Sequence, residues 1–159
     1  MVQGKKTILL ICSGNTCRSP MAKVILEHKL KDLAKSGQFT VRSVARYTPT
    51  SIEASFHARE TIKTLYGRDL LAAYKPGSLT TELTENSDLI LVMTDGMKYG
   101  LPPAKTYSVK EYGGGAGDVM DPFGGDLDCY LECANELSSI IEKVVARLCP
   151  IGMAVLFIL

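Results

Sequence analysis

The sequence has no marked excess of charge of either sign. Its 159 residues carry a formal net charge of +1, and charged residues make up 22% of the chain. A polybasic surface for nucleic acid or for an anionic membrane is therefore not indicated. The length suits one domain with a substantial core, and no repeat, low-complexity tract or interdomain linker interrupts it.

The sequence also has no long apolar run. No stretch approaches the ~20 apolar residues of a membrane-spanning helix, so no membrane span is expected. The run at residues 8–12 is too short for the apolar region of a secretory signal. The five cysteines are scattered and odd in number, which is typical of reduced thiols in a cytosol. We therefore expect a cytoplasmic protein.

Clusters of metal ligands and nucleotide-binding motifs are missing as well. The two histidines, His28 and His57, lie in helical segments without metal-ligand companions, so no metal site is expected. The glycine-rich residues 113–117 fit neither Gly-x-Gly-x-x-Gly nor a Walker sequence. We expect no cofactor.

Apolar runs of strand length alternate with helical patterns along the chain. Strands are predicted at residues 7–11, 39–44, 88–93 and, more weakly, 105–109. Helices are predicted from Pro20 onward, at residues 52–65 with a stop at Gly67, at 79–86 and at about 126–148. This order predicts an α/β fold: a single-domain three-layer sandwich with a central four-stranded parallel sheet flanked by helices. The site should lie at the carboxyl ends of the strands.

The domain is expected to cover residues 1–150. Residues 151–159 form a mostly apolar tail after Pro150. We expect the tail to pack on the same domain, as an edge strand or a buried segment. The alternative is a contact with a partner chain or a membrane surface, although so short a tail cannot span a bilayer.

The most informative passage directly follows the first predicted strand and precedes a helix. It reads Cys12-Ser13-Gly14-Asn15-Thr16-Cys17-Arg18-Ser19-Pro20. A loop at this position turns successive backbone N–H groups and the positive end of the helix dipole toward one spot, where an anion or a thiolate is favoured. We call residues 12–18 the phosphate loop, because Arg18 adds a planar fork of donors that matches phosphate oxygens. Nucleophile and phosphate cradle coincide there, as a cysteine-dependent phosphatase requires.

This passage resembles the signature of the low-molecular-weight protein tyrosine phosphatases, and the resemblance extends to about Leu148. A second match is Asp121-Pro122-Phe123, where that family carries its general acid in an Asp-Pro loop. The spacing alone does not choose between Asp121 and its neighbours Asp118 and Asp126. The resemblance implies Cys12, Arg18 and Asp121 as catalytic residues. It also implies a phosphate site formed by Ser13, Gly14, Asn15, Thr16, Cys17, Arg18 and Ser19.

Ser19 is expected to cap the helix, with Pro20 at its first position, because proline lacks the N–H that has no partner there. Further roles follow only from the resemblance, which implies that the Ser19 hydroxyl also donates to the thiolate. Asn15 is expected to tie the loop together. The cysteine matching Cys17 can form a protective disulfide with the nucleophile in the family, whereas a buried spectator thiol is the alternative here. The supporting residues depart from the family pattern at Ser43-Val44-Ala45 and at Tyr74-Lys75-Pro76.

Two features of the sequence resemble those of the protein arginine phosphatases, a branch of the same family. They are Thr16 in the loop and Phe123-Gly124-Gly125 after the Asp-Pro pair, which make Thr16 and Phe123 candidates for the substrate pocket. We expect hydrolysis of phosphoarginine in proteins through a phosphocysteine, with phosphotyrosine as the alternative. Thiol-dependent arsenate reductases share the fold but need a cysteine pair near mid-chain, and no cysteine lies between Arg18 and Cys129. Phosphorylated proteins are the expected partners of a monomer or weak dimer, with no nucleic acid.

Overall fold

The computed structural model describes residues 4–150. The expectation for the tail at residues 151–159 lies outside this part of the chain. None of the helices in the described part is long and apolar enough to cross a membrane.

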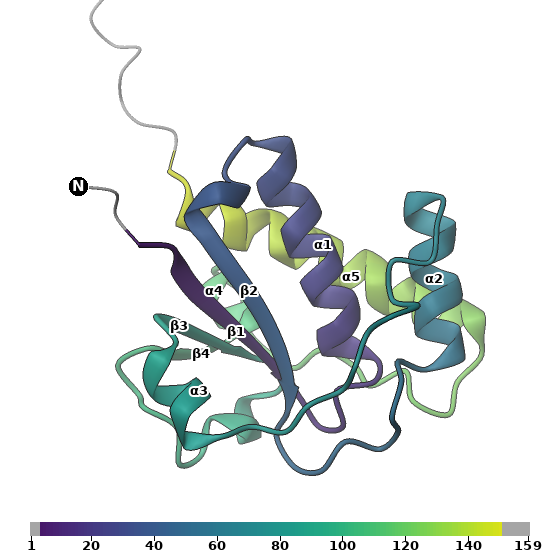
Figure 1. Cartoon of the computed structure of the whole chain (residues 1–159), viewed down its shortest axis with the longest axis horizontal. Coiled ribbons are helices and arrows are strands. Elements are labelled where there is room, and N and C mark those ends of the chain that lie inside the picture. The colour runs from purple at the N-terminus through teal and green to yellow at the C-terminus, as the bar shows by residue number, and fades with distance from the viewer. Residues whose placement is uncertain (1–3, 151–159) are drawn as a thin grey trace, which may run out of the picture.

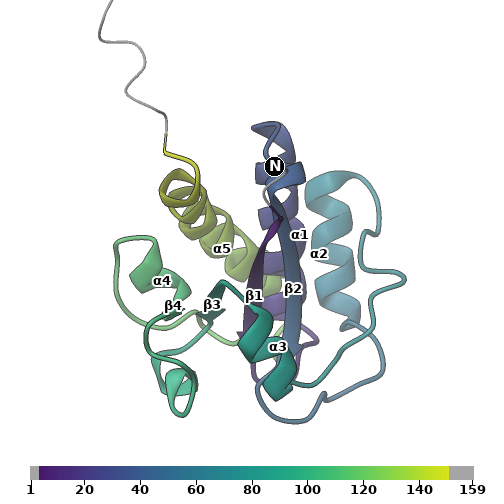
Figure 2. The same cartoon turned by 60° about the vertical axis from the view of Figure 1, so that its left-hand side comes forward.

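Four parallel strands form the centre of the molecule. They are β1 (Lys6–Cys12), β2 (Phe39–Ala45), β3 (Leu89–Val92) and β4 (Thr106–Ser108), in the order β2-β1-β3-β4 (Figure 2). The predicted four-stranded parallel sheet is confirmed. Strand β1 lies between β2 and β3 and is buried from Ile8 onward on both faces, as is usual for parallel sheets. Its last residue, Cys12, therefore lies at the carboxyl end of an inner strand, with a neighbouring strand on each side.

Helices cover both faces of this sheet (Figures 1 and 2). On one face pack α1 (Arg18–Asp32), α2 (Phe56–Tyr66) and α5 (Leu127–Leu148), with the short α4 (Val109–Tyr112) against α5. The other face is covered by α3 (Thr81–Asn86) and the 3₁₀ turn Asp95–Lys98. Alternate side chains of β1 divide between the two cores, with Ile8 and Leu10 in one and Leu9 and Ile11 in the other.

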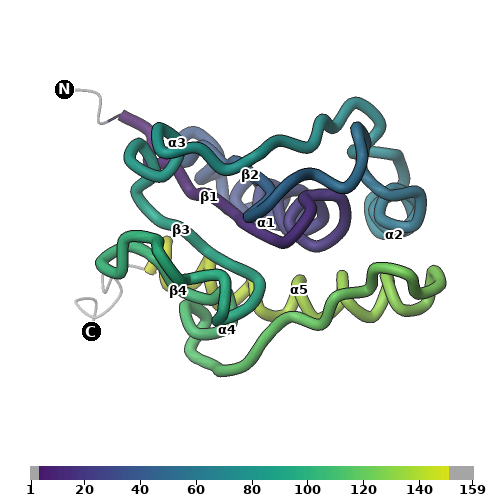
Figure 3. The backbone as a smooth tube through the Cα atoms, turned by 90° about the horizontal axis from the view of Figure 1, so that it is seen from below, coloured from purple at the N-terminus to yellow at the C-terminus, as the bar shows by residue number. Residues whose placement is uncertain are grey.

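The carboxyl ends of the strands gather the loops that matter for function. The β1–α1 turn, the loop of residues 46–55 after β2 and the segment leading into α5 all lie at this end of the sheet (Figures 1 and 3). We call residues 46–55 the β2–α2 loop and residues 118–126 the acid loop. The topology thus places Cys12 and Asp121, far apart in sequence, at the same end of the sheet.

The start of α1 differs from the expectation. The helix begins at Arg18 with Cys17 as its N-cap, and no side chain caps it. Ser19 is therefore not the N-cap and Pro20 not the first helical residue. Pro20 is tolerated at the third position because first-turn N–H groups have no partner within the helix. The Ser19 hydroxyl faces Cys12 instead.

Helix α2 also begins later than the predicted residue 52. It starts at Phe56, because the Ser55 hydroxyl accepts the N–H of Ala58 and caps it there, which leaves residues 46–55 as a loop. Its predicted end is confirmed: Gly67 follows Tyr66 with φ of 79° in the left-handed region. The sequence pattern missed α4, which a capping box between Ser108 and Glu111 defines.

Gly67 provides a test of this helix end. Gly67→Ala should lower the free energy of unfolding by ~1 kcal/mol, because a left-handed conformation is strained for any residue with a Cβ. No steric clash contributes, since nothing lies within 4 Å of a Cβ built there. Gly37→Ala is the matched control, with equally open space and no positive φ. Urea unfolding of the two variants compares them, and equal midpoints would contradict the backbone argument.

Candidate active site

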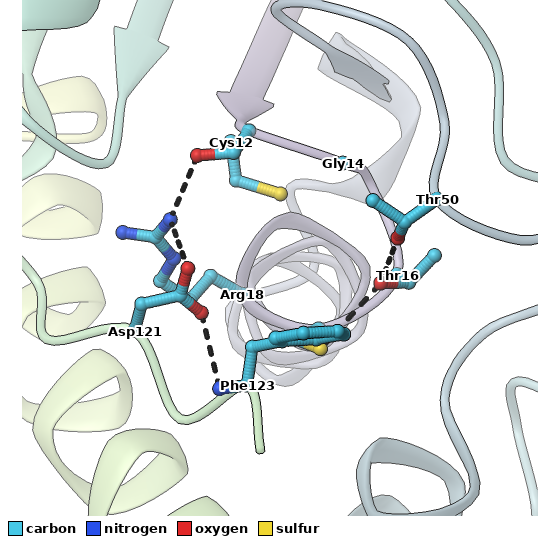
Figure 4. A pocket seen from close by; sticks show the side chains of 9 residues that line it. Cys12, Gly14, Thr16, Arg18, Thr50, Asp121 and Phe123 are labelled. Carbon is cyan, nitrogen blue, oxygen red and sulfur yellow. Dashed lines mark hydrogen bonds and ion pairs between the residues drawn. The ribbon is translucent and has the colours of Figure 1, made fainter.

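A pocket of about 220 Å³ opens at the carboxyl end of β1 (Figure 4). Cys12 lies on one side of it, Arg18 and Asp121 on a second, and Thr16 and Thr50 on a third, with Phe123 at its edge (Figure 4). The pocket brings together most of the residues that the sequence analysis singled out. Its lining consists of Cys12, Ser13, Gly14, Thr16, Cys17, Arg18, Thr50, Asp121 and Phe123.

The Cys12 thiol is the group around which the pocket is built. It is 3% exposed, and its Sγ points into the pocket (Figure 4). The backbone N–H of Asn15 donates to this sulfur at 3.3 Å, and the Ser19 hydroxyl lies 3.0 Å from it. The adjacent start of α1 directs its dipole the same way. These groups can stabilise negative charge on the sulfur during a reaction.

Asn15 holds the phosphate loop in shape from behind. Its backbone has φ of 56°, in the left-handed region, and the residue is fully buried. Its amide nitrogen donates to the hydroxyls of Ser19 and Ser43, both at 2.8 Å. Its amide oxygen accepts from the Tyr74 hydroxyl at 2.8 Å and from the Gly77 N–H at 3.0 Å. All four hydrogen-bonding positions of the amide are therefore used.

Asn15 and Ser19 were expected among the phosphate-binding residues, but neither lines the pocket. The amide of Asn15 points away from the cavity because it is committed to Ser19, Ser43, Tyr74 and Gly77. Ser19 reaches the site through the sulfur of Cys12.

Tyr74 completes the support of the loop. Its hydroxyl contacts Ser43 and donates to Asn15. Burial raises the pKa of Tyr74 to about 12, even though the hydrogen bonds with Ser43 and Asn15 act to lower it. The hydroxyl therefore keeps its proton, and stays a donor to Asn15, throughout the neutral range. The sequence marked Tyr74 only as a departure from the family pattern.

Arg18 links the phosphate loop to the acid loop. The residue is 3% exposed. One terminal nitrogen donates to the carbonyl of Val119 at 3.0 Å. The other donates to the Ser13 hydroxyl at 3.2 Å and to the Asp121 carboxylate at 3.1 Å. The guanidinium is thus fixed at the pocket wall, with its planar donors available to an entering phosphate.

The structure distinguishes between the three nearby carboxylates. Asp121 lines the pocket, with its side chain about half exposed and one oxygen accepting the N–H of Phe123. Asp118 accepts the backbone N–H of Asp95. Asp126 caps α5 by accepting the N–H of Cys129, and this hydrogen bond lowers the pKa of its carboxyl. Only Asp121 among them faces Cys12 across the cavity.

Cys17 lies in the pocket wall in a hydrogen-bonded setting. Its sulfur is 3.1 Å from the Tyr130 hydroxyl and also contacts the hydroxyl of Ser55. Burial raises the pKa of Tyr130 to about 12, so this hydroxyl is neutral. Cys12 and Cys17 are both free thiols here. The three remaining cysteines, Cys129, Cys133 and Cys149, lie on α5 or at its end, and none lines the pocket.

Phe123 and Thr50 complete the lining of the pocket. Phe123, a candidate for the substrate pocket from the sequence, is 68% exposed at the pocket edge. Thr50, from the β2–α2 loop, lies 3.1 Å from Thr16, hydroxyl to hydroxyl. The sequence analysis missed Thr50 because no motif marks its loop. Within residues 4–150, no group of three or more metal-ligating side chains could hold a metal ion.

Comparison with known proteins agrees with this geometry. The family described as low molecular weight phosphotyrosine protein phosphatase matches residues 7–150. The chain belongs to this family. The match covers both the phosphate loop and the acid loop, and so the whole of the pocket.

Individual relatives of this low-molecular-weight phosphatase extend over nearly the same length. A protein-arginine-phosphatase of Bacillus subtilis (strain 168) is 33% identical over 150 residues, which cover 89% of this chain and 95% of the relative. A low molecular weight protein tyrosine phosphatase from T. tengcongensis has a TM-score of 0.82 at 36% identity. The match covers 90% of this chain and 99% of that protein's chain. A cysteine-to-serine mutant of the YwlE arginine phosphatase, with a phosphorylated active-site serine, has a TM-score of 0.81 at 32% identity. The match covers 89% of this chain and 95% of the mutant's chain.

The family and these relatives define the class of the enzyme. It is a cysteine-dependent phosphatase, and phosphorylated proteins are its substrates. The low-molecular-weight phosphatase fold is that of an α/β sandwich with its pocket at the carboxyl edge of the sheet.

Tyr74→Phe tests the support of the phosphate loop. Removing the hydroxyl leaves the buried amide oxygen of Asn15 with Gly77 alone, so we expect a loss of ~1–2 kcal/mol in unfolding free energy and a lower kcat at neutral pH. The difference in unfolding free energy between wild type and Tyr74→Phe should be complete below pH 10 and fall as pH rises toward 12. Above pH 10 a tyrosine ionises in the unfolded chain, whereas burial keeps Tyr74 neutral in the folded chain, and this favours unfolding.

Tyr66→Phe is the control for this experiment. Tyr66 is half-buried, and its hydroxyl makes no hydrogen bond within the described part of the chain. Its removal should leave kcat at neutral pH unchanged. Urea unfolding at a series of pH values and steady-state kinetics provide the data. Equal kcat for Tyr74→Phe and wild type would show that the loop keeps its shape without this hydroxyl.

Proposed function

We propose that this phosphatase removes the phosphoryl group from phosphoarginine in proteins, with Cys12 as nucleophile, Arg18 as phosphate clamp and Asp121 as general acid and base. The observation that carries the arginine assignment is the Thr16 hydroxyl in the pocket wall, across the cavity from Asp121 (Figure 4). The name of the 33% identical Bacillus subtilis relative supports it.

Phosphate binding uses the loop and Arg18 together. The backbone N–H groups of the loop residues that line the pocket and the start of α1 surround the phosphoryl oxygens, and the guanidinium of Arg18 adds two parallel donors. Arg18 already points at Asp121 and Ser13 from the pocket wall. An entering phosphate therefore replaces these partners without a large movement of the guanidinium.

The first chemical step forms a phosphocysteine. The Cys12 sulfur attacks phosphorus, the bond from phosphorus to the guanidinium nitrogen breaks, and Asp121 protonates that nitrogen as it leaves. The phosphorylated serine in the YwlE mutant supports covalent transfer to a residue of the active site in this family.

The second step restores the enzyme. Asp121, now ionised, takes a proton from a water molecule that attacks the phosphocysteine, and the bond between sulfur and phosphorus breaks. The sulfur leaves as a thiolate, which the Ser19 hydroxyl and the Asn15 N–H stabilise from 3.0 and 3.3 Å. Inorganic phosphate is the product.

Two features of the pocket support a guanidinium rather than a phenyl ring as the group next to the phosphate. Thr16 supplies a hydroxyl where a bulky aliphatic residue would flank a ring, and Gly124 and Gly125 leave the wall beyond Phe123 without side chains. Phosphotyrosine is the second candidate, because the exposed ring of Phe123 at the pocket edge offers one aromatic face to a phenyl group.

We also propose that residues 1–150 act as one domain in the cytoplasm, as a monomer or weak dimer. The continuous cores on the two faces of one sheet support the single domain. The five free cysteines support a reducing compartment.

Asp121→Ala tests the general acid. The rate with phosphoarginine should fall by ~100- to 10,000-fold. An aryl phosphate with a good leaving group should lose much less, since it needs little protonation. Asp118→Ala is the matched control, because its carboxylate accepts a backbone N–H outside the pocket. A larger loss for Asp118→Ala than for Asp121→Ala in steady-state kinetics would reassign the role.

A substrate comparison tests the arginine assignment. We expect a higher kcat/KM for a phosphoarginine peptide than for the matched phosphotyrosine peptide. Thr16→Ile should shift this ratio toward phosphotyrosine by roughly 10- to 200-fold, the range for one pocket substitution. A wild-type enzyme that prefers phosphotyrosine would overturn the assignment, whatever the variant does.

A further inference from the structure

Thr50, in the β2–α2 loop, is in direct contact with the phosphate loop. Its backbone N–H donates to the carbonyl of Gly14 at 3.3 Å. A Cβ built on Gly14 would lie 2.7 Å from Thr50 Cγ2 and 2.8 Å from its Oγ1. The absence of a side chain at Gly14 is therefore what lets Thr50 approach the loop so closely.

The rest of the β2–α2 loop holds Thr50 in this place. On one side, the N–H of Tyr47 donates to the carbonyl of Ser13 at 3.4 Å. On the other, the N–H of Ser55 donates to the carbonyl of Thr16 at 2.9 Å. With the Thr50 bond between them, these contacts join the two loops at three successive points.

Thr50 and Thr16 form a pair of hydroxyl groups in the pocket wall. Their oxygens are 3.1 Å apart, and both residues line the cavity on the side away from Asp121 (Figure 4). One hydroxyl donates its proton to the other. The Thr16 oxygen also lies 3.5 Å from the sulfur of Cys17, so it contacts both Thr50 and Cys17. The pair still keeps unused acceptor lone pairs, because each hydroxyl has one donor and two acceptor positions.

This pair has the chemistry to distinguish the two candidate substrates. A phosphorylated guanidinium carries several N–H donors next to the phosphoryl group, whereas the aryl ester of phosphotyrosine carries none. A guanidinium can therefore donate to the unused lone pairs of the two hydroxyls, whereas a phenyl ring offers them no hydrogen bond. Sites built to hydrogen-bond a substrate discriminate strongly against analogues that lack the matching group.

We propose that Thr50 is a specificity-determining residue, which with Thr16 forms a two-hydroxyl wall that accepts N–H groups from the guanidinium of phosphoarginine. The inference rests on the proposed function and extends it to a residue on a different loop. Thr50 orients the hydroxyl of Thr16 and adds acceptor capacity of its own. The β2–α2 loop is thus a further part of the chain, besides the phosphate loop and the acid loop, that sets the substrate.

Thr50→Val is the direct test, because valine keeps the shape of threonine and lacks the hydroxyl. The ratio of kcat/KM for a phosphoarginine peptide to that for the matched phosphotyrosine peptide should fall roughly tenfold, mainly through loss of activity on phosphoarginine. Thr50→Ser, which restores the hydroxyl, should return the ratio to within about twofold of wild type.

Inorganic phosphate, as a competitive inhibitor, reports whether the phosphate loop is intact. Its inhibition constant should be the same for wild type and Thr50→Val, since the proposed contact is with the guanidinium. A changed constant would show that Thr50 acts by shaping the loop and would overturn the proposal. In the double variant Thr16→Val/Thr50→Val, the ratio should fall little further than in either single variant.

The measurements distinguish the proposed function from the role of Thr50. The wild-type ratio alone tests the proposed function, and a preference for phosphotyrosine overturns that function. The effect of Thr50→Val on the ratio tests the role of Thr50, whichever substrate the wild type prefers. An unchanged ratio in Thr50→Val, or an equal fall in Thr50→Ser, overturns the role of Thr50.

Discussion

The fully bonded amide of Asn15 is the interaction on which the rest of the site depends. A left-handed residue in a buried loop is unfavourable unless its surroundings fix it, and here all four positions of the amide are satisfied. These bonds join the phosphate loop to β2 through Ser43 and to the segment before α3 through Tyr74 and Gly77. The Asn15 N–H can point at the Cys12 sulfur because the backbone is held in this conformation.

Arg18 provides the complementary link across the pocket. A buried guanidinium needs partners, because an unpaired charge away from water is costly. Val119, Ser13 and Asp121 supply them. The same side chain thus places the acid loop opposite the nucleophile and prepares the phosphate clamp. Arg18 shares this placement of the acid loop with the backbone, since the N–H of Val119 also donates to the carbonyl of Met93 just after β3.

Much of this architecture could be predicted from the sequence, since it follows from local patterns. Apolar runs indicated the sheet, and the position of Cys12 after the first run placed it at the carboxyl edge. The order of the phosphate loop and the Asp-Pro pair indicated the family. Tyr74, Thr50 and Tyr130 could not be assigned, because their roles depend on the paths of loops that no periodicity describes. The prediction that Ser19 caps α1 was wrong because the hydroxyl contacts Cys12 instead.

The central claim is that the phosphoryl group passes through the sulfur of Cys12. Rapid mixing of the enzyme with a phosphoarginine peptide, quenching within a single turnover and mapping by mass spectrometry tests it most directly. The account predicts one phosphoryl group on the peptide that contains Cys12, appearing before free phosphate and disappearing as phosphate is released. A phosphoryl group on another residue, or turnover with no phosphorylated enzyme at any time, would contradict it.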